Sequence, residues 1–108
     1  RWICAHWGGG LPFYSLNRRV RKALRNVWVD TAAGPLLYHP SVWKIVRDLL
    51  GAEKILAASD FPLRLQPSRP AEEGWRSLWQ QLDEAPLSRE EKAAIEGGNL
   101  RDFLGLRG

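Results

Sequence analysis

The sequence has no methionine and only one cysteine, Cys4, among its 108 residues. A lone cysteine has no intramolecular disulfide partner, which favours a reducing compartment. No apolar run approaches the roughly 20 residues that span a membrane, and no signal peptide is visible. We therefore expect a cytoplasmic protein with no membrane partner. Because methionine is missing even at position 1, we also expect a processed piece or an excerpt of a longer chain.

The composition is that of a folded chain, with 44% hydrophobic residues and six tryptophans. This is enough apolar material for the core of one domain, and it excludes a disordered tail. The net charge of +4 comes largely from one predicted helix. A basic helix in a tryptophan-rich chain is compatible with nucleic-acid binding. The tryptophans, however, do not lie between the basic residues, where they could stack on bases. We therefore expect a solvent-facing helix and no nucleic-acid partner. The basic residues of this helix are Arg18, Arg19, Arg21, Lys22 and Arg25.

Three apolar segments have the length of buried strands, at residues 2–6, 27–31 and 54–60. The continuous apolar character of the first predicts burial on both faces. Apolar spacings of three and four predict helices over 13–25 and 42–50. Alternation of strands and helices with short links predicts a parallel sheet with right-handed crossovers.

The remaining segments are predicted from turn and capping signals. Residues 8–12, 36–40 and 63–71 are predicted to be loops, and residues 72–82 a helix. Ser88 and Glu91 have the spacing of a capping box, which predicts a helix start. Gly97 and Gly98 are predicted to end that helix, and Asn99 to cap a last short one.

Two chemically reactive side chains follow predicted strands. His6 comes after the first strand and precedes three glycines, and Asp60 comes after the third strand and precedes Pro62, which cannot continue a central strand. In sheets built from strand-helix units, catalytic and binding groups gather at the carboxyl ends of the strands. We therefore predict that His6 and Asp60 face each other across one site.

The length of the chain limits what this sheet can be. Three parallel strands alone would leave two apolar edges open, which natural domains avoid. A complete eight-stranded barrel needs about 200 residues or more. If the sheet belongs to a barrel, this chain is less than half of it.

Five motifs together carry a resemblance to a known family: Ala5-His-Trp-Gly-Gly-Gly-Leu-Pro12, Val29-Asp-Thr-Ala32, Gly51-Ala-Glu-Lys-Ile55, Ser59-Asp-Phe-Pro62 and Gly97-Gly-Asn99. In this order and spacing the chain resembles the C-terminal part of amidohydrolase-related metal-dependent hydrolases, most of all the branch that contains aminocarboxymuconate-semialdehyde decarboxylase. The resemblance implies an α/β fold in which residues 1–108 are a single partial domain. They would form about three βα units and terminal helices of a (β/α)8 TIM barrel.

The resemblance also implies a metal site. His6 resembles the histidine that orients a metal-bound water, and Asp60 the aspartate that ligates the metal or holds that water. The expected cofactor is a divalent ion, zinc or alternatively manganese, which would lower the pKa of bound water toward neutrality. The family's paired histidines and a further ligand would lie upstream. Because His6, His39 and Asp60 do not make a three-ligand site, this chain alone is expected to be inactive.

The implied activity is that of a hydrolase or non-oxidative decarboxylase acting on a small carboxylated or lactone-like molecule. Substrate contacts are expected from His39, Arg64 and Arg69. The expected partners are the missing N-terminal part of the barrel and, by resemblance, a second copy in a homodimer. The alternative is a non-catalytic fragment that completes a barrel with another chain or serves as an interaction surface.

Several residues keep two interpretations at this stage. His39 precedes Pro40 and can cap a helix instead of contacting substrate. Asp30 and Thr31 either act at the site or bind loop amides. The Gly8–Gly10 loop either cradles an anion through its amides or permits a tight turn.

Overall fold

The sheet has three parallel strands in the order β1-β2-β3, so β2 is the central strand. The structure is a computed structural model, and it describes residues 1–64 and 70–106. The strands are β1 (Trp2–Cys4), β2 (Val27–Asp30) and β3 (Ile55–Leu56). The α-helices are α1 (Arg18–Ala23), α2 (Gly34–Leu37), α3 (Val42–Leu50), α4 (Ala71–Glu84), α5 (Arg89–Ala93) and α6 (Asn99–Leu104). Helical turns of 3-10 type cover His6–Gly8, Leu11–Leu16, Leu24–Asn26 and Ala52–Lys54, and a π-helical turn covers Ala94–Gly98.

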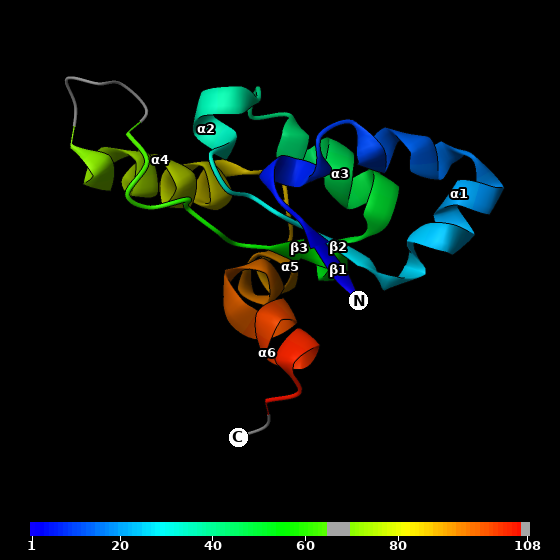
Figure 1. The fold of residues 1–108 in the computed structure, drawn as a ribbon. Coiled ribbons are helices and arrows are strands. Elements are labelled where there is room, and N and C mark those ends of the chain that lie inside the picture. Colours follow the sequence, from blue (N-terminus) through cyan, green and yellow to red (C-terminus); the bar gives the residue numbers. More distant parts are fainter. Residues whose placement is uncertain (65–69, 107–108) are drawn as a thin grey trace.

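Helices lie on both sides of this small sheet. Figure 1 shows α1 to α4 above the strands and α5 and α6 below them. The hydrophobic core joins β2 and β3 to α3, α4 and the π-helical turn, through side chains that include Val29, Val46, Leu78, Leu82 and Ile95. The predicted parallel sheet is confirmed, and so is the predicted chain order of strand, helical segment, strand, helical segment, strand. No helix among the described residues is long and apolar enough to cross a bilayer.

Local signals set the ends of several helices. Asn17 caps α1, because its side chain accepts hydrogen bonds from the amides of Arg19 and Val20 at 3.0 and 3.3 Å. Gly51 ends α3 with φ of 96°, a conformation that residues with a Cβ rarely adopt. The capping box of Ser88 and Glu91 is present as predicted, with both reciprocal hydrogen bonds formed.

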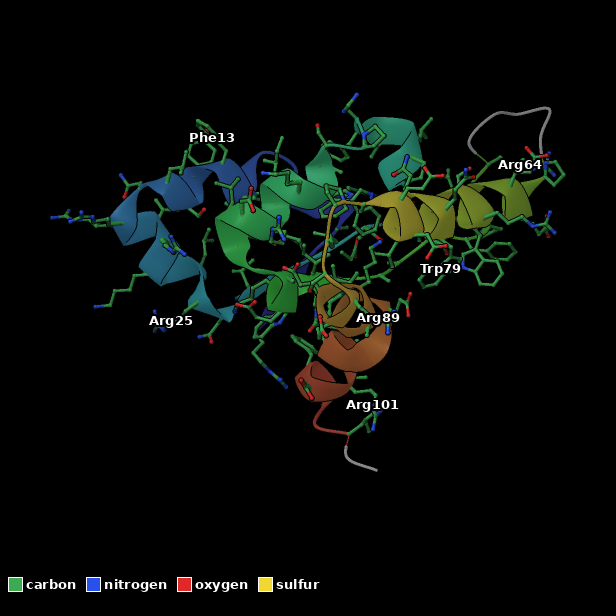
Figure 2. The ribbon with its side chains drawn as sticks, turned by 180° about the vertical axis from the view of Figure 1, so that it is seen from behind. Phe13, Arg25, Arg64, Trp79, Arg89 and Arg101 are labelled. Atoms are coloured by element: carbon green, nitrogen blue, oxygen red, sulfur yellow. The ribbon has the colours of Figure 1, made fainter. Side chains whose placement is uncertain are left out.

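The segment from residue 8 to residue 25 differs from the prediction. The expected loop contains 3-10 turns, and the expected helix over 13–25 is divided into a 3-10 turn, the short α1 and another 3-10 turn. The division occurs at Asn17, whose side chain bonds backbone amides in place of a continuing helix. As a consequence Phe13 and Leu16 are exposed, and Figure 2 shows Phe13 pointing away from the body of the molecule.

Burial of the first strand also differs from the prediction. Trp2 and Ile3 are 72% and 43% exposed, because β1 lies at the edge of the sheet and its outer side has no strand neighbour among the described residues. The third strand is paired only at Ile55–Leu56, shorter than predicted. The loop predicted over 36–40 overlaps a short helix, α2, which begins at Gly34 and Pro35.

The C-terminal glycines do not end a helix. Gly97 and Gly98 lie within a π-helical turn that continues directly into α6, and Asn99 is part of that helix rather than its cap. The Asn99 side chain is instead buried and donates hydrogen bonds to the carbonyls of Ala52 and Ile55, at 2.7 and 2.8 Å. One amide group thereby fixes α6 to the segment that leads into β3.

We predict that Asn99→Ala lowers the free energy of unfolding by about 1 to 3 kcal/mol, because it leaves the Ile55 carbonyl without its donor, while the Ala52 carbonyl keeps the Ile55 amide. Asn99→Asp keeps the shape but places an acceptor against both carbonyls, so it is expected to be at least as destabilising. Urea denaturation followed by tryptophan fluorescence measures both effects. Asn26→Ala, at an exposed asparagine, is the control and is expected to change the stability by about 0.5 kcal/mol or less. Equal effects of Asn99→Ala and Asn26→Ala would contradict this role.

Candidate active site

The carboxyl ends of the three strands meet at one edge of the sheet. The register pairs Cys4 with Val29 and Asp30 with Leu56, so His6 follows β1 and Asp60 follows β3 at that edge. Neighbouring strands are about 4.8 Å apart, which places the ends of β1 and β3 roughly 10 Å apart, with the end of β2 between them.

The backbone is strained at the end of every strand. Among the described residues, the non-glycine residues with positive φ are His6 (57°), Trp7 (58°), Ala33 (56°) and Asp60 (61°). Each such residue costs of order 1–3 kcal/mol unless the surrounding structure compensates, and such residues cluster at functional sites. All four lie in the segments that follow the three strands, on the side where the sequence predicts the site.

Hydrogen bonds hold His6 in this conformation. Its amide donates to Asp30 Oδ1 at 3.1 Å, and its carbonyl accepts from the Tyr38 hydroxyl at 2.8 Å. Its ring Nδ1 lies 2.9 Å from the carbonyl oxygen of Ala32. A carbonyl only accepts, so Nδ1 carries the proton of this bond, and in the neutral imidazole Nε2 keeps its lone pair. Nε2 is the one polar atom of His6 without a partner among the described residues.

Asp60 is placed differently from His6. Its carbonyl accepts from the Leu63 amide at 2.8 Å, and the following amide, of Phe61, donates to Ser59 Oγ at 3.0 Å. These bonds form a tight turn around Asp60, whose carboxylate is exposed and makes no hydrogen bond or ion pair within the described part of the chain. Asp tolerates the left-handed conformation better than most residues.

Residues at the end of β2 connect the two loops. Asp30 Oδ1 accepts from the amides of His6 and Ala32, which bears out the interpretation that this aspartate binds loop amides. The buried Thr31 hydroxyl donates to the carbonyl of Ala58 at 2.8 Å and accepts from its amide at 2.9 Å. The segment that carries His6 and the segment that carries Asp60 are therefore both bonded to the end of β2.

Trp7, the residue after His6, anchors this turn in the hydrophobic core. Its ring is 1% exposed and packs edge-on against Trp43, with ring centroids 4.8 Å apart. Trp7 Nε1 has no hydrogen-bond partner among the described residues and lies against Gly34, where an added Cβ would be only 2.8 Å away. Gly8 is similarly confined, since a Cβ there would meet Val29 Cγ1 at 3.0 Å. Gly8 and Gly9 also have positive φ, of 73° and 61°, which favours the tight-turn interpretation of the Gly8–Gly10 loop.

Two of the residues predicted to contact substrate, His39 and Arg64, lie outside this group. His39 is exposed, and its Nδ1 accepts from the Ser41 amide at 3.1 Å and contacts Ser41 Oγ at 3.0 Å, so its side chain is bonded to the residue that precedes α3. Figure 2 shows Arg64 beside the first turns of α4, at the periphery of the molecule. Arg69 falls outside the described residues. The structure assigns no substrate contact to these residues, which stay predictions.

The donor atoms at this edge are of a kind that binds metal ions. Imidazole nitrogen and carboxylate oxygen are both ligands of zinc and manganese. Catalytic zinc sites use three protein ligands, however, and the described residues contain no group of three His, Cys, Asp or Glu side chains that could hold an ion. His6 and Asp60 fit the chemistry of a divalent ion but need further ligands to bind it.

Residues 1–106 match the sequence profile of the amidohydrolase family. The chain belongs to the amidohydrolase family. No curated protein matches it. The structure of this amidohydrolase chain is similar to that of dihydroxybenzoic acid decarboxylase from Polaromonas sp. JS666, solved with bound manganese and the inhibitor 2-nitroresorcinol. The TM-score is 0.74 and the identity 18%, over 98% of this chain and 34% of that one.

Two further structures show the same fold. A 5-carboxyvanillate decarboxylase from Sphingomonas paucimobilis has a TM-score of 0.70 and 21% identity, over 97% of this chain and 33% of that one. An amidohydrolase from Burkholderia multivorans with bound zinc has a TM-score of 0.66 and 21% identity, over 97% and 44%. This amidohydrolase chain therefore spans about a third of the length of the two decarboxylases.

The sequence predicts His6 and Asp60 as site residues but does not indicate which groups hold His6 in place. The Tyr38 hydroxyl and the Ala32 carbonyl are bonded to His6, and neither carries a motif that marks it. The sequence marks Thr31 only as a polar residue at the end of a strand, and it does not indicate which groups its hydroxyl bonds.

We predict that Thr31→Val loosens the connection between β2 and the Asp60 segment. Valine keeps the shape but leaves the amide and carbonyl of Ala58 without partners, which is expected to lower the free energy of unfolding by about 1 to 3 kcal/mol. Amide hydrogen exchange at Ala58 is expected to accelerate. Thr31→Ser keeps the hydroxyl and is the control, in which the slow exchange of the Ala58 amide is retained. Unchanged exchange in Thr31→Val would contradict the proposed connection.

Proposed function

We propose that this chain is the C-terminal part of a metal-dependent amidohydrolase barrel that hydrolyses or decarboxylates a small carboxylated molecule. The observation that carries the proposal is the state of His6, in which every polar atom except Nε2 is bonded, on the same sheet edge as the free carboxylate of Asp60. A histidine fixed in this way offers one lone pair in one direction. That is the arrangement of a group that accepts a proton or binds an ion.

In this proposal, the three units of the chain are strands six, seven and eight of a (β/α)8 barrel. The similarity to about a third of each of two decarboxylase chains supports a partial barrel. The outer side of β1 would then pair with one of the strands from the rest of the barrel, whereas the outer side of β3 is bonded by Asn99 and Ile95. Ligands from those strands would complete the donor set that His6 and Asp60 begin.

The two side chains would have different tasks. A divalent ion, zinc or manganese, would supply positive charge that lowers the pKa of a water and polarises a substrate oxygen. Asp60, exposed at the end of a tight turn, would contribute an oxygen ligand or hold that water. His6 would accept a proton at Nε2, while the bond from Nδ1 to the Ala32 carbonyl keeps the ring oriented and stabilises the positive charge that develops.

Decarboxylation of an aromatic acid is the more specific form of this proposal. Its support is that the similar structures include decarboxylases described for dihydroxybenzoic acid and 5-carboxyvanillate. In that reaction the proton that replaces the carboxyl group must reach a ring carbon. His6, once protonated at Nε2, would be positioned to donate it.

One observation favours a second candidate function, a non-catalytic chain that completes a barrel with a partner. The described residues contain no three-ligand group, while Trp2 and Ile3 expose apolar surface at a sheet edge. The two candidates differ in a measurable way, since only the enzyme binds metal through Asp60.

We predict that Asp60→Asn and His6→Gln, in the longer protein that supplies the other strands, each lower kcat for release of carbon dioxide from 2,6-dihydroxybenzoate by about 100-fold or more. Asp60→Asn is also expected to lower the bound manganese or zinc measured by plasma emission spectroscopy, whereas His6→Gln retains more of it. Asp102→Asn, at an exposed aspartate of α6, is the matched control and should keep both activity and metal. Full metal and full activity in Asp60→Asn would exclude the proposed mechanism. Absence of metal and activity in the unsubstituted protein would favour the non-catalytic candidate.

A further inference from the structure

Asp30 joins the two residues whose contact sets the protonation of the His6 ring. Its Oδ1 accepts from the His6 amide at 3.1 Å and from the Ala32 amide at 3.0 Å. The ring Nδ1 of His6 in turn lies 2.9 Å from the Ala32 carbonyl oxygen. These hydrogen bonds form a closed cycle through one carboxylate oxygen. The imidazole and the carbonyl that accepts its proton are therefore positioned by the same atom.

The turn after β2 directs the Ala32 carbonyl. The Gly34 amide donates to the Thr31 carbonyl at 2.9 Å, which closes a turn with Ala32 and Ala33 at its centre. Ala33 has φ of 56° and ψ of 15°, whereas Ala32 is not among the described residues with positive φ. Positive φ at the third turn position alone is typical of a type II turn, whose central peptide is rotated relative to that of a type I turn. The Ala32 carbonyl belongs to this central peptide, so its direction depends on the strained conformation of Ala33.

The tautomer of His6 decides whether Nε2 can accept a proton. A neutral imidazole carries its single ring proton either on Nδ1 or on Nε2. In free histidine the Nε2–H form is the more populated, but the bond from Nδ1 to the Ala32 carbonyl requires the Nδ1–H form. The less favoured tautomer is therefore maintained by one acceptor, which has to stay within hydrogen-bond distance of the ring.

The other contacts of this turn do not bond the Ala32 segment. The Tyr38 hydroxyl donates to the His6 carbonyl at 2.8 Å, and the Trp7 ring is buried in the core. Both contacts hold the backbone of the turn, but neither reaches the imidazole or its acceptor. Among the described residues, only the Asp30 side chain bonds the backbone amides of both His6 and Ala32.

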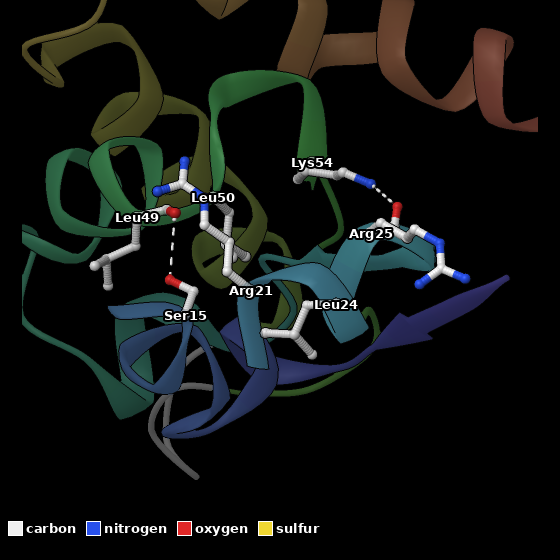
Figure 3. A pocket seen from close by; sticks show the side chains of 7 residues that line it. All are labelled: Ser15, Arg21, Leu24, Arg25, Leu49, Leu50 and Lys54. Carbon is white, nitrogen blue, oxygen red and sulfur yellow. Dashed lines mark hydrogen bonds between the residues drawn. The ribbon is translucent and has the colours of Figure 1, made fainter. Parts of the chain in front are cut away.

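Contacts that do not involve the Asp30 side chain hold β2 in the sheet. The strand is paired with β1 on one side and with β3 on the other. At its amino end, Lys54 Nζ donates to the Arg25 carbonyl, which connects the segments that precede β3 and β2 (Figure 3). A substitution at Asp30 is therefore expected to change the loops at the carboxyl end and to leave the strands paired.

We propose that Asp30 is a positioning residue that keeps the neutral His6 ring in its Nδ1–H tautomer, by holding the His6 and Ala32 amides on one oxygen atom. Nε2 then retains the lone pair that a proton acceptor needs. This consequence for catalysis rests on the proposed function, whereas the tautomer itself does not. The role depends on where the acceptor oxygen lies, because one oxygen has to reach both amides, and a displaced negative charge does not replace it.

The test is the tautomer of His6, measured from proton–nitrogen correlation spectra of the imidazole rings. The spectra are recorded at about pH 8.5, where an ordinary imidazole with a pKa of about 6.5 is neutral. The second histidine of the chain, His39, is bonded to Ser41 and serves as the internal reference. In the unsubstituted protein we expect His6 to be predominantly in the Nδ1–H form.

Three substitutions of Asp30 separate the position of the oxygen from its charge. Asp30→Ala removes both hydrogen bonds, and we expect the Nε2–H form of His6 to become the major one. Asp30→Glu keeps the charge but displaces the oxygen by a methylene group, so the same shift is expected, which gives a second measurement if Asp30→Ala does not fold. Asp30→Asn keeps Oδ1 and places its NH₂ group where Oδ2 has no hydrogen-bond partner among the described residues. It is expected to retain the Nδ1–H form.

Tyr38→Phe is the matched control, because it removes a different hydrogen bond of the same turn and leaves the cycle intact. It should retain the Nδ1–H form of His6. An equal shift in Tyr38→Phe and Asp30→Ala would mean that any loosening of the turn releases the ring, and would overturn the proposal. It would also be overturned by an unchanged tautomer in Asp30→Glu, or by equal shifts in Asp30→Asn and Asp30→Glu. Circular dichroism spectra equal to that of the unsubstituted protein show that the variants are folded.

Activity of the longer protein distinguishes this inference from the proposed function. If both are correct, Asp30→Glu lowers kcat for release of carbon dioxide by about tenfold or more, and the kcat of Asp30→Asn stays above that of Asp30→Glu. A shifted tautomer with unchanged kcat would support the positioning role of Asp30 and count against His6 Nε2 as the proton acceptor. An unchanged tautomer would overturn the positioning role whatever the activity.

Discussion

The carboxyl end of β2 is the point on which the arrangement of the site depends. Within the part of the chain that the structure describes, this strand alone has a strand neighbour on both sides, and its last residues bond the loops that follow those neighbours. The Asp30 carboxylate accepts a hydrogen bond from the His6 amide on one side. On the other side, the Thr31 hydroxyl is hydrogen-bonded to the carbonyl and amide of Ala58. Without these two short side chains, the loops after β1 and β3 would have no common support. The imidazole and the carboxylate would then no longer be held relative to each other.

This support has to offset a conformational cost. His6, Trp7, Ala33 and Asp60 have backbone angles that residues with a Cβ rarely adopt. The cost at His6 is offset by bonds to its amide and carbonyl and by the burial of Trp7, whose ring fills the space beneath the turn. These hydrogen bonds and this packing thus stabilise a strained backbone that presents Nε2 of His6, and such strain is typical of functional sites.

The sequence predicted those parts of the structure that local patterns encode. The parallel sheet, α3 and the capping box at Ser88 follow from apolar spacing and from cap residues, and the structure confirms them. The predicted placement of His6 and Asp60 at the carboxyl edge of the sheet also agrees with the strand register, because side chains that follow parallel strands share one edge.

The parts that could not be predicted depend on contacts between distant residues. The glycine pair before Asn99 signals a helix end, but burial of the Asn99 amide against two carbonyls of the β3 segment keeps the chain helical. The spacing of Phe13 and Leu16 predicts a buried helix face, yet neither is covered by the described residues. Tyr38 bonds His6 across 32 positions of sequence, and no local pattern indicates such a contact.

The outer side of β1 has a consequence for how the protein behaves in solution. Its backbone donors and acceptors have no strand beside them among the described residues, and Trp2 next to them is 72% exposed. An uncovered strand of this kind is a template on which another polypeptide can add its own strand. A strand paired with β1, as proposed for the rest of the barrel, would therefore also protect against self-association, and a preparation without it is expected to lose protein to aggregates as its concentration rises.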